Sequence, residues 1–189
     1  MIGGVFVQAT QGTPAGNANM FPANGKPAFA IDGDSVHSKY RNFGEINTGF
    51  VVTPSFGGGQ GGVGTFVTRL DIATANDAPE RDPLTFTLEG TNGDPLTGNY
   101  TLIASGSTGL ENDLGRSTGV ISATFPGVGA FTSYRVIFPT VRDSATADSM
   151  QVGEVAISGV RAPEPSVFCL LGLSAIRLTG ARRKRPAAV

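Results

Sequence analysis

The 189-residue sequence contains no tryptophan, one cysteine and one histidine. The lone cysteine, Cys169, lies in an apolar segment near the end of the chain, which excludes a disulfide framework and a cysteine metal site in the body. The lone histidine, His37, cannot form a His-x-x-x-His metal pair, and no Gly-x-Ser-x-Gly elbow accompanies it. We therefore expect that the protein is not an enzyme.

The body of the chain also lacks helical patterns, because no stretch of ten or more residues outside the tail combines helical periodicity with capping signals. Its 27 glycines and 12 prolines favour short strands joined by turns. Runs rich in β-branched and aromatic residues lie between turn clusters at residues 49–53, 65–75, 84–89, 100–104, 119–125, 131–138 and 150–158. The sequence therefore predicts an all-β fold, an antiparallel sandwich or jelly roll, followed by a short apolar C-terminal helix or tail.

One of these runs shows which side chains of a strand should face a core. In FTSYRVIF, Tyr134, Val136 and Phe138 fall on one side of an extended chain, and Arg135 and Ile137 fall on the other. The glycine-rich segment GGGQGGVG at residues 57–64 lacks the Gly-Lys-Ser/Thr and the helix of a phosphate-binding loop. We expect it to be a hairpin connection between two strands.

Charge is divided unevenly along the chain. Residues 1–160 hold 8 Lys and Arg against 14 Asp and Glu, a net charge of −6, whereas residues 161–189 hold 6 against 1, a net charge of +5. The basic run directly follows an apolar window at residues 166–180, an order that favours contact with a membrane over binding of nucleic acid. The window is shorter than the roughly 20 residues that span a bilayer and contains Arg177, so only transient membrane contact is expected.

The C-terminal tail has three parts in order. A Pro-Glu-Pro motif at Pro163, Glu164 and Pro165 precedes the apolar window, and a basic flank follows it, made of Arg182, Arg183, Lys184 and Arg185. This order resembles the PEP-CTERM sorting signal of Gram-negative bacteria. The resemblance implies an exported protein of the cell envelope, cell surface or extracellular matrix, whose partners are the export machinery and the sorting enzyme exosortase.

The N-terminal twelve residues, MIGGVFVQATQG, lack the basic start of a secretory leader. Because a C-terminal sorting signal presupposes export, we expect the leader to lie upstream of this sequence. The chain then divides into an N-terminal segment at 1–14, a β domain at 15–160 and the sorting signal at 161–189.

Two stretches of the body, AFAIDGDSVHSKYRNFG and MQVGEVAISG, carry a second resemblance. Together they resemble the discoidin-like, galactose-binding-like jelly roll of coagulation-factor C-terminal domains and bacterial carbohydrate-binding modules. The matching positions are Ala30, Asp32, Gly33, Asp34, Ser38, Tyr40 and Glu154. Ser38 and Tyr40 stand where that family more often has threonine and tryptophan.

The resemblance implies a structural calcium ion, held in that family by the equivalent loop and closing glutamate. The corresponding residues are Asp32, Asp34, Ser38 and Glu154, and an Asp-Gly-Asp turn does offer the oxygen ligands that calcium requires. The alternative is an ordinary Asp-Gly turn closed by side-chain hydrogen bonds to its own backbone.

A charged loop, ANDAPERDP at residues 75–83, gives the candidate ligand residues. Arg81 is expected either to pair with the flanking Glu80 and Asp82 or to hold the hydroxyls of a sugar. The candidates for a carbohydrate site are Asn76, Asp77, Arg81 and the ring of Tyr40.

The expected function is thus a non-catalytic binding or structural module at the cell surface, with polysaccharide as the candidate ligand. One alternative is a matrix component without a ligand site. The other is a small glycoside hydrolase that would use a carboxylate pair from Asp77, Glu80 and Asp82.

Overall fold

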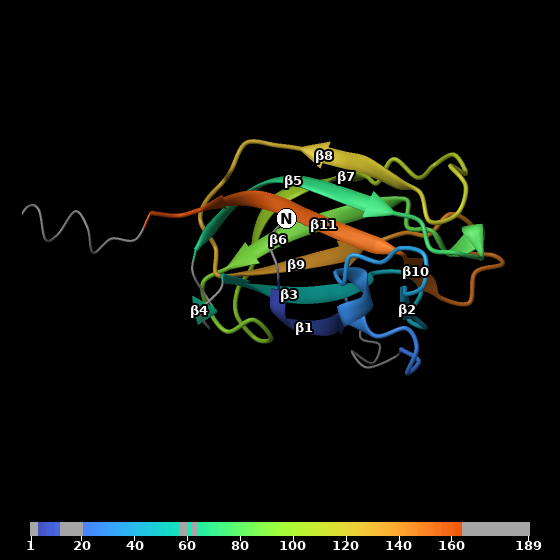
Figure 1. Ribbon diagram of the computed structural model, residues 1–189, viewed down its shortest axis with the longest axis horizontal. Coiled ribbons are helices and arrows are strands. Elements are labelled where there is room, and N and C mark those ends of the chain that lie inside the picture. The colour runs from blue at the N-terminus through green and yellow to red at the C-terminus, as the bar shows by residue number, and fades with distance from the viewer. Residues whose placement is uncertain (1–3, 12–20, 57–59, 62–63, 164–189) are drawn as a thin grey trace, which may run out of the picture.

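The structure is a computed structural model, and it describes residues 4–11, 21–56, 60–61 and 64–163. In these ranges the chain is built from strands and two short 3-10 helices (Figure 1). The strands are β1 (Gly4–Gln11), β2 (Tyr40–Asn42), β3 (Thr48–Phe56), β4 (Gln60–Gly61), β5 (Thr65–Ala73), β6 (Thr85–Thr91), β7 (Thr101–Ser107), β8 (Gly119–Thr124), β9 (Ser133–Phe138), β10 (Met150–Val152) and β11 (Glu154–Arg161). The 3-10 helices are η1 (Pro27–Ala30) and η2 (Pro79–Arg81).

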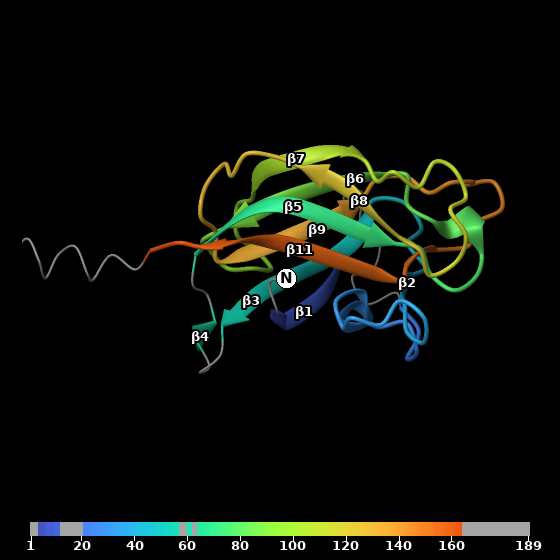
Figure 2. The same cartoon turned by 45° about the horizontal axis from the view of Figure 1, so that its top comes forward.

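These strands form two facing sheets and a small third one, as the two views in Figures 1 and 2 show. The larger sheet has the order β1-β3-β9-β6-β7, with β4 beside β3, and the smaller has the order β11-β5-β8. Strands β2 and β10 pair with each other at one end. All of these pairs are antiparallel, so the predicted antiparallel sandwich is confirmed.

The core fills the space between the two sheets. In β9, Tyr134, Val136 and Phe138 have no exposed surface, as their alternation in the sequence predicts. The larger sheet adds Phe50, Val52, Phe86 and Leu88, and the smaller sheet adds Val67, Leu70, Ile72, Val155 and Ile157. Burial of these apolar side chains is the main force that holds the sheets together.

Each of the seven predicted runs overlaps a strand, and the run at 150–158 overlaps two. Gly153 separates β10 from β11, and its N–H donates to the carbonyl of Ala73 over 2.9 Å. A side chain at this position would bring a Cβ to 2.4 Å from the carbonyl oxygen of Thr74. The change of sheet between β10 and β11 therefore requires glycine at residue 153.

Two expectations about the fold need correction. Strand β1 pairs with β3 along its length, so residues 4–11 belong to the larger sheet, although the sequence placed the start of the domain at residue 15. The expected hairpin between the strands on either side of segment 57–64 is wrong, because those strands, β3 and β5, lie in different sheets. Within the segment, Gln60–Gly61 form β4, which pairs with the end of β3. A run of glycines does not reveal whether the chain returns to the same sheet or crosses to the other one.

Most of the C-terminal signal lies outside the described residues. Pro163 is the last residue described, while Glu164, Pro165, the window 166–180 and the basic flank Arg182, Arg183, Lys184 and Arg185 lie beyond it. Within the described ranges, no helix is long and apolar enough to cross a bilayer.

Candidate functional site

Four connections between strands meet at one end of the sandwich, at the right in Figures 1 and 2. They are the β2–β3, β5–β6, β7–β8 and β9–β10 connections, and we call this region the loop end. Among the residues that the structure describes, four non-glycine residues have positive φ angles, and all lie in these connections: Glu45, Asn47, Ala78 and Ser117. Backbone of this kind costs energy, and it persists only where surrounding contacts impose it.

A buried ion cluster supplies such contacts. Asp82 has no exposed surface, and its carboxylate accepts two hydrogen bonds from Arg116, at 3.0 and 2.8 Å, and one from Arg142 at 3.1 Å. Arg142 also donates to the carbonyl oxygens of Pro79 at 2.9 Å and of Glu111 at 2.8 Å. Three connections that are distant in sequence are therefore fixed to one another through two arginines.

A second group of side chains lies at the surface of the loop end. Arg41 in β2 stacks over the ring of Phe43, with 4.8 Å between its Cζ atom and the ring centroid. Its Nη2 donates to both oxygens of Asp148, at 3.0 and 2.9 Å, and its Nε donates to the hydroxyl of Ser149 over 2.8 Å. The Nε atom of Arg81 lies 2.8 Å from Asp148 Oδ1, so the same carboxylate forms ion pairs with both arginines.

We call Arg41, Phe43, Arg81 and Asp148 the Phe43 cluster. Phe43 is 40% exposed and the Asp148 side chain is 59% exposed, whereas the two arginines are mostly covered. The cluster thus offers an exposed aromatic ring beside a carboxylate that accepts two hydrogen bonds from Arg41 and forms an ion pair with Arg81, whose Nε has no hydrogen-bond partner among the described residues. The hydrogen bond from Ser149 and the charge of Arg41 hold the pKa of Asp148 below its usual value, so it remains ionised at neutral pH.

The sequence-predicted ligand residues fall into two groups. Asn76 and Asp77 lie in the β5–β6 connection, where both side chains accept hydrogen bonds from Lys39. Arg81 belongs to the Phe43 cluster and pairs with Asp148, with Glu80 farther away at 3.8 Å. Asp82, which was expected to pair with Arg81, binds Arg116 and Arg142 instead.

Tyr40 is a wrong ligand candidate. Its side chain has no exposed surface and packs edge-on against Phe50, with 6.0 Å between ring centroids. Its hydroxyl donates to the carbonyl of Gly49 over 2.6 Å and accepts from the Asn42 side chain. A ring in this position stabilises the core and cannot contact a ligand.

The carboxylate pair required by a hydrolase is not supported at the predicted residues. Asp82 is buried and neutralised by two arginines, and Asp77 accepts a short hydrogen bond from Lys39. Burial tends to raise the pKa of Asp77, but the bonds from Lys39 and Gln151 outweigh it and lower that pKa. Asp77 is therefore ionised at neutral pH, whereas glycoside hydrolysis requires one carboxyl group that acts as a protonated acid.

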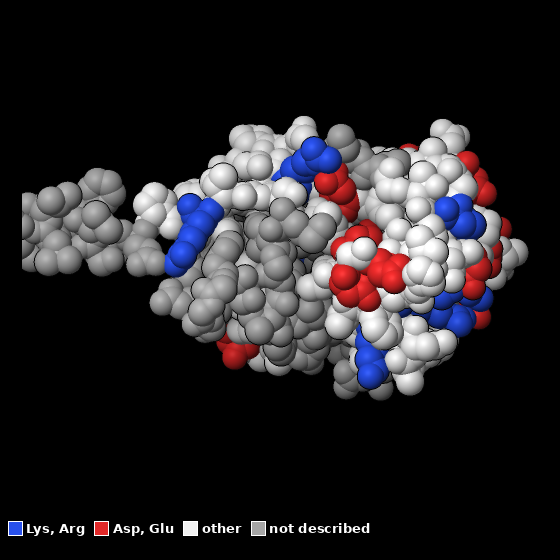
Figure 3. Space-filling model, viewed as in Figure 1, with Lys and Arg blue, Asp and Glu red and all other residues white. Residues whose placement is uncertain are grey.

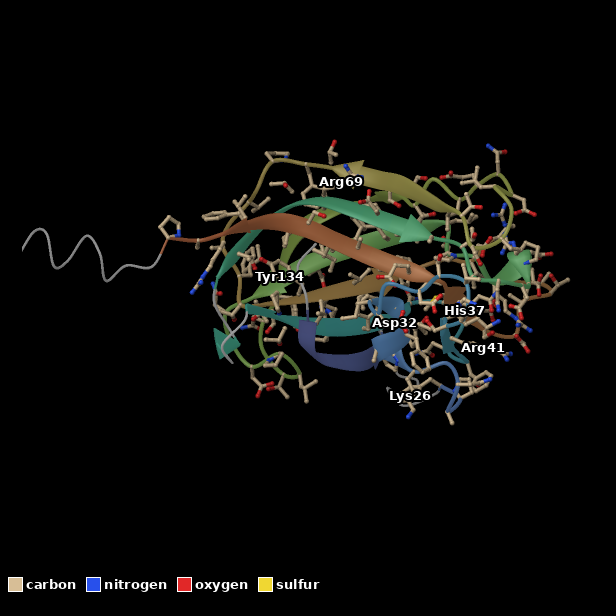
Figure 4. The ribbon with its side chains drawn as sticks, viewed as in Figure 1. Lys26, Asp32, His37, Arg41, Arg69 and Tyr134 are labelled. Atoms are coloured by element: carbon tan, nitrogen blue, oxygen red, sulfur yellow. The ribbon has the colours of Figure 1, made fainter. Side chains whose placement is uncertain are left out.

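The Asp-Gly-Asp loop and the closing glutamate do meet. The N–H of Gly33 donates to Glu154 Oε2 over 3.0 Å, so the loop lies beside the start of β11. Figure 4 labels Asp32 in this loop. Ser38 donates to Asp32 Oδ2 over 2.7 Å. The Asp34 carboxylate accepts from the N–H groups of Val36 and His37, so it closes the turn as an ordinary aspartate does.

Glu154 is poorly satisfied in this arrangement. Its Oε1 atom is shielded from solvent and has no hydrogen-bond partner among the described residues. Burial, with a smaller contribution from the charges of Asp32 and Asp34, raises the pKa of Glu154 to about 7. Across the described ranges, no three His, Cys, Asp or Glu side chains already converge as a metal site.

Sequence reasoning missed Arg41, Phe43 and Asp148. The aromatic candidate in the sequence was Tyr40, whereas the exposed ring at the loop end belongs to Phe43. A usable signal was the spacing of Arg41 and Phe43, because residues two apart on an extended segment point to the same side. Nothing in the sequence indicates that Asp148 joins them, since the contact depends on the pairing of β2 with β10.

No protein-family model and no curated protein matches this chain. Among solved structures, the family 32 carbohydrate-binding module of NanJ from Clostridium perfringens, in complex with galactose, matches with a TM-score of 0.53 and 12% identity, over 80% of this chain and 91% of that one. Two family 32 modules of ZmpB from the same organism, in complex with GalNAc, match with a TM-score of 0.55 and 14% identity, over 83% of this chain and 34% of that one.

A third module, from a family 31 glycoside hydrolase of Clostridium perfringens, matches with a TM-score of 0.54 and 11% identity, over 81% of this chain and 90% of that one. The chain has the fold of family 32 carbohydrate-binding modules. The galactose-binding-like sandwich expected from the sequence is thus confirmed at the level of the fold, which in these modules is non-catalytic.

The ion cluster makes Asp82 sensitive to substitution. We expect Asp82→Asn to lower the free energy of unfolding by about 3–5 kcal/mol, because it leaves two partly buried arginines without their shared anion. Asp113→Asn is the matched control: Asp113 also pairs with Arg116, at 2.7 Å, but its side chain is 54% exposed, so a loss of at most about 1 kcal/mol is expected. Urea unfolding measures both, and equal losses would contradict the assignment.

The raised pKa of Glu154 predicts that the free energy of unfolding depends on pH when a chelator removes calcium. Its pKa is higher in the folded protein than in the unfolded chain, so its contribution to stability is complete below about pH 4.5 and falls as pH rises toward 7. Glu154→Gln removes this loss. The stability of the variant relative to wild type should therefore be greater at pH 8 than at pH 5 in urea unfolding, and an equal difference at both pH values would refute the prediction.

Proposed function

We propose that the protein binds carbohydrate, without catalysing its cleavage, at the Phe43 cluster. The observation that carries the proposal is the exposed Phe43 ring beside an Asp148 carboxylate that is held by hydrogen bonds from Arg41 and paired with the charge of Arg81. A pyranose presents an apolar C–H face that can stack on such a ring, while its hydroxyls donate to the carboxylate. Small-molecule sites commonly combine apolar surface with a few placed polar groups in this way.

The structural neighbours support the choice of ligand class. One was solved with galactose and another with GalNAc, and both have the fold seen here. The loop end also has the strained backbone and the buried ion cluster that hold a binding surface in one shape. A surface that is already ordered loses less conformational entropy when a sugar binds.

Substitution of the aromatic ring tests the proposal. We expect Phe43→Ala to weaken binding of galactose-containing oligosaccharides at least tenfold, because the ring supplies most of the apolar contact. Val128→Ala is the control, since Val128 is 57% exposed and lies in the β8–β9 connection at the opposite end. Calorimetry on a panel of such sugars gives the affinities.

Two results would contradict the proposal. Unchanged affinity in Phe43→Ala would place the sugar elsewhere. No binding by the wild-type protein to any member of the panel would favour a structural matrix component without a ligand site.

We propose further that calcium binds between the Asp-Gly-Asp loop and β11. The chemistry of the donors fits: Glu154 has a shielded oxygen without a hydrogen-bond partner among the described residues, and the loop whose Gly33 contacts this glutamate carries the oxygens of Asp32 and Ser38. Asp34 would act mainly by closing the loop, because its carboxylate already accepts the N–H groups of Val36 and His37. A cation here would neutralise a group of like charges and tie the loop to the smaller sheet.

Thermal unfolding tests this calcium site. At a calcium concentration of about 100 times Kd, the stabilisation is about 2.7 kcal/mol, which for a domain of this size corresponds to a rise in Tm of about 5–10 °C. Asp32→Asn should abolish most of the rise. Asp94→Asn, which alters a similar turn-closing aspartate elsewhere, should leave it intact. Equal Tm values in calcium and in chelator would exclude the site.

We also propose that the protein is exported and sorted by exosortase through its C-terminal signal. The support is the order of Pro-Glu-Pro, apolar window and basic flank in the sequence. In the native host, Pro165→Ala should leave an uncut chain, whereas Pro126→Ala should be processed normally. Fractionation and intact mass measure this, and an uncut cytoplasmic wild-type protein would refute the proposal.

A further inference from the structure

The described chain ends at the opposite end of the sandwich from the loop end. Strand β11 and residues 161–163 finish at the left in Figures 1 and 2, whereas the loop end lies at the right. The start of β5 and the β8–β9 connection lie at this end too, because Thr65 and Phe131 exchange backbone hydrogen bonds of 2.9 and 3.0 Å. The N–H of Ala162 donates to the carbonyl of Gly64 over 2.8 Å. We call this region the exit end.

The surface of the exit end is apolar. Val160 is 63% exposed and Val128 is 57% exposed, the two highest values among the large apolar side chains that the structure describes. Val160 pairs with Phe66 in the register of β11 and β5. A Cβ at Gly127, the neighbour of Val128, would lie 3.4 Å from the Phe66 side chain. The two exposed valines therefore lie around one half-buried aromatic side chain, and we call Phe66, Val128 and Val160 the valine patch.

The two ends of the domain differ in charge. The β8–β9 connection at the exit end, residues 125–132, contains no charged side chain. On the face shown in Figure 3, most acidic side chains lie in the half nearer the loop end. An anionic surface therefore repels the loop end more strongly than the exit end. The four connections of the loop end contain three arginines against eight acidic residues, a net charge of −5, the acidic ones being Glu45, Asp77, Glu80, Asp82, Glu111, Asp113, Asp143 and Asp148.

The sequence places the apolar window at 166–180 close to the exit end. Two residues, Glu164 and Pro165, separate Pro163 from the first residue of the window. An extended chain spans at most about 3.6 Å per residue, so the window begins within about 11 Å of Pro163. When the window enters a bilayer, the exit end must therefore approach the surface of that bilayer. The loop end, at the other end of the sandwich, is then directed away from the lipid.

We propose that the exit end is a docking surface for a phospholipid bilayer, and that the valine patch lies in the interfacial layer while the window is inserted. The proposal rests on the proposed export and on membrane contact of the window, and it does not depend on sugar binding. Two exposed valines bury little apolar area, so they bind lipid weakly by themselves. The window holds them at the surface, where a weak contact becomes effective because it is intramolecular. The Phe43 cluster then remains accessible to carbohydrate outside the membrane.

Fluorescence quenching tests the orientation. The full chain, with Cys169→Ala to remove its own thiol, is bound to vesicles of phosphatidylcholine and phosphatidylglycerol that contain a lipid with a nitroxide headgroup. A label attached at Val128→Cys should lose at least about five times more of its emission than a label at Ile46→Cys, a 47% exposed position at the loop end. Equal quenching at the two positions, or stronger quenching at residue 46, overturns the proposal.

Two matched pairs of substitutions test the valine patch. Val128→Asp combined with Val160→Asp should raise the lipid concentration for half-maximal binding at least about tenfold, because both changes remove apolar contact and add charge that phosphatidylglycerol repels. Ile46→Asp combined with Leu114→Asp makes the same change at two exposed positions of the loop end and should leave vesicle binding unchanged. Thermal unfolding confirms that both double variants are folded. Equal effects of the two pairs would refute the contact.

The outcomes separate this surface from the proposed functions. The affinity for galactose-containing sugars should be the same on vesicles as in solution, because the Phe43 cluster is directed away from the lipid. If the wild-type chain does not bind vesicles, the docking surface is refuted, and sugar binding in solution is unaffected by that result. If the chain binds but residue 128 is unquenched and light scattering shows dimers, a second copy covers the patch and the proposal is again refuted.

Discussion

The shape of the loop end depends on one buried carboxylate. Asp82 has no contact with solvent, and burial of a charge is costly unless close partners compensate it. Arg116 and Arg142 provide that compensation, and Arg142 also binds main-chain carbonyls of two other connections. Because the charge must stay paired, the three connections cannot move independently.

The buried ion cluster also restrains the Phe43 cluster, because residues of both lie in the same connections. Arg81 directly precedes Asp82, and Asp148 lies in the same connection as Arg142. The short pairing of β2 with β10 then brings Arg41 against Asp148 and Ser149. A surface cluster of charged side chains would be worth little if its members were mobile. Here two arginines and a carboxylate are held in position before any ligand arrives, which favours binding.

The strands were predictable because their alternation reports directly which side chains face a core. In β9, the residues Tyr134, Val136 and Phe138 are buried as the pattern requires. The approach of Glu154 to the Asp-Gly-Asp loop was also foreseen, and Gly33 donates to it. That expectation came from a resemblance in sequence and not from the spacing of the residues.

The burial of Tyr40 and the partner of Arg81 could not be predicted from the sequence, because both depend on contacts between distant segments. Tyr40 follows a loop and looks exposed in the sequence, yet it lies in the core because β2 turns its ring toward Phe50. Arg81 has carboxylates on both sides in the sequence, but its partner is Asp148, from a different connection. Local charge patterns do not identify ion pairs that tertiary structure creates.

The most direct test of the account is an NMR titration of the isotope-labelled protein with a galactose-containing disaccharide. The account predicts saturable shifts in the amide signals of residues 41–47, 77–82 and 142–149, together with the ring signals of Phe43. Saturable shifts confined to other parts of the protein, or no shifts at all, would contradict carbohydrate binding at the Phe43 cluster.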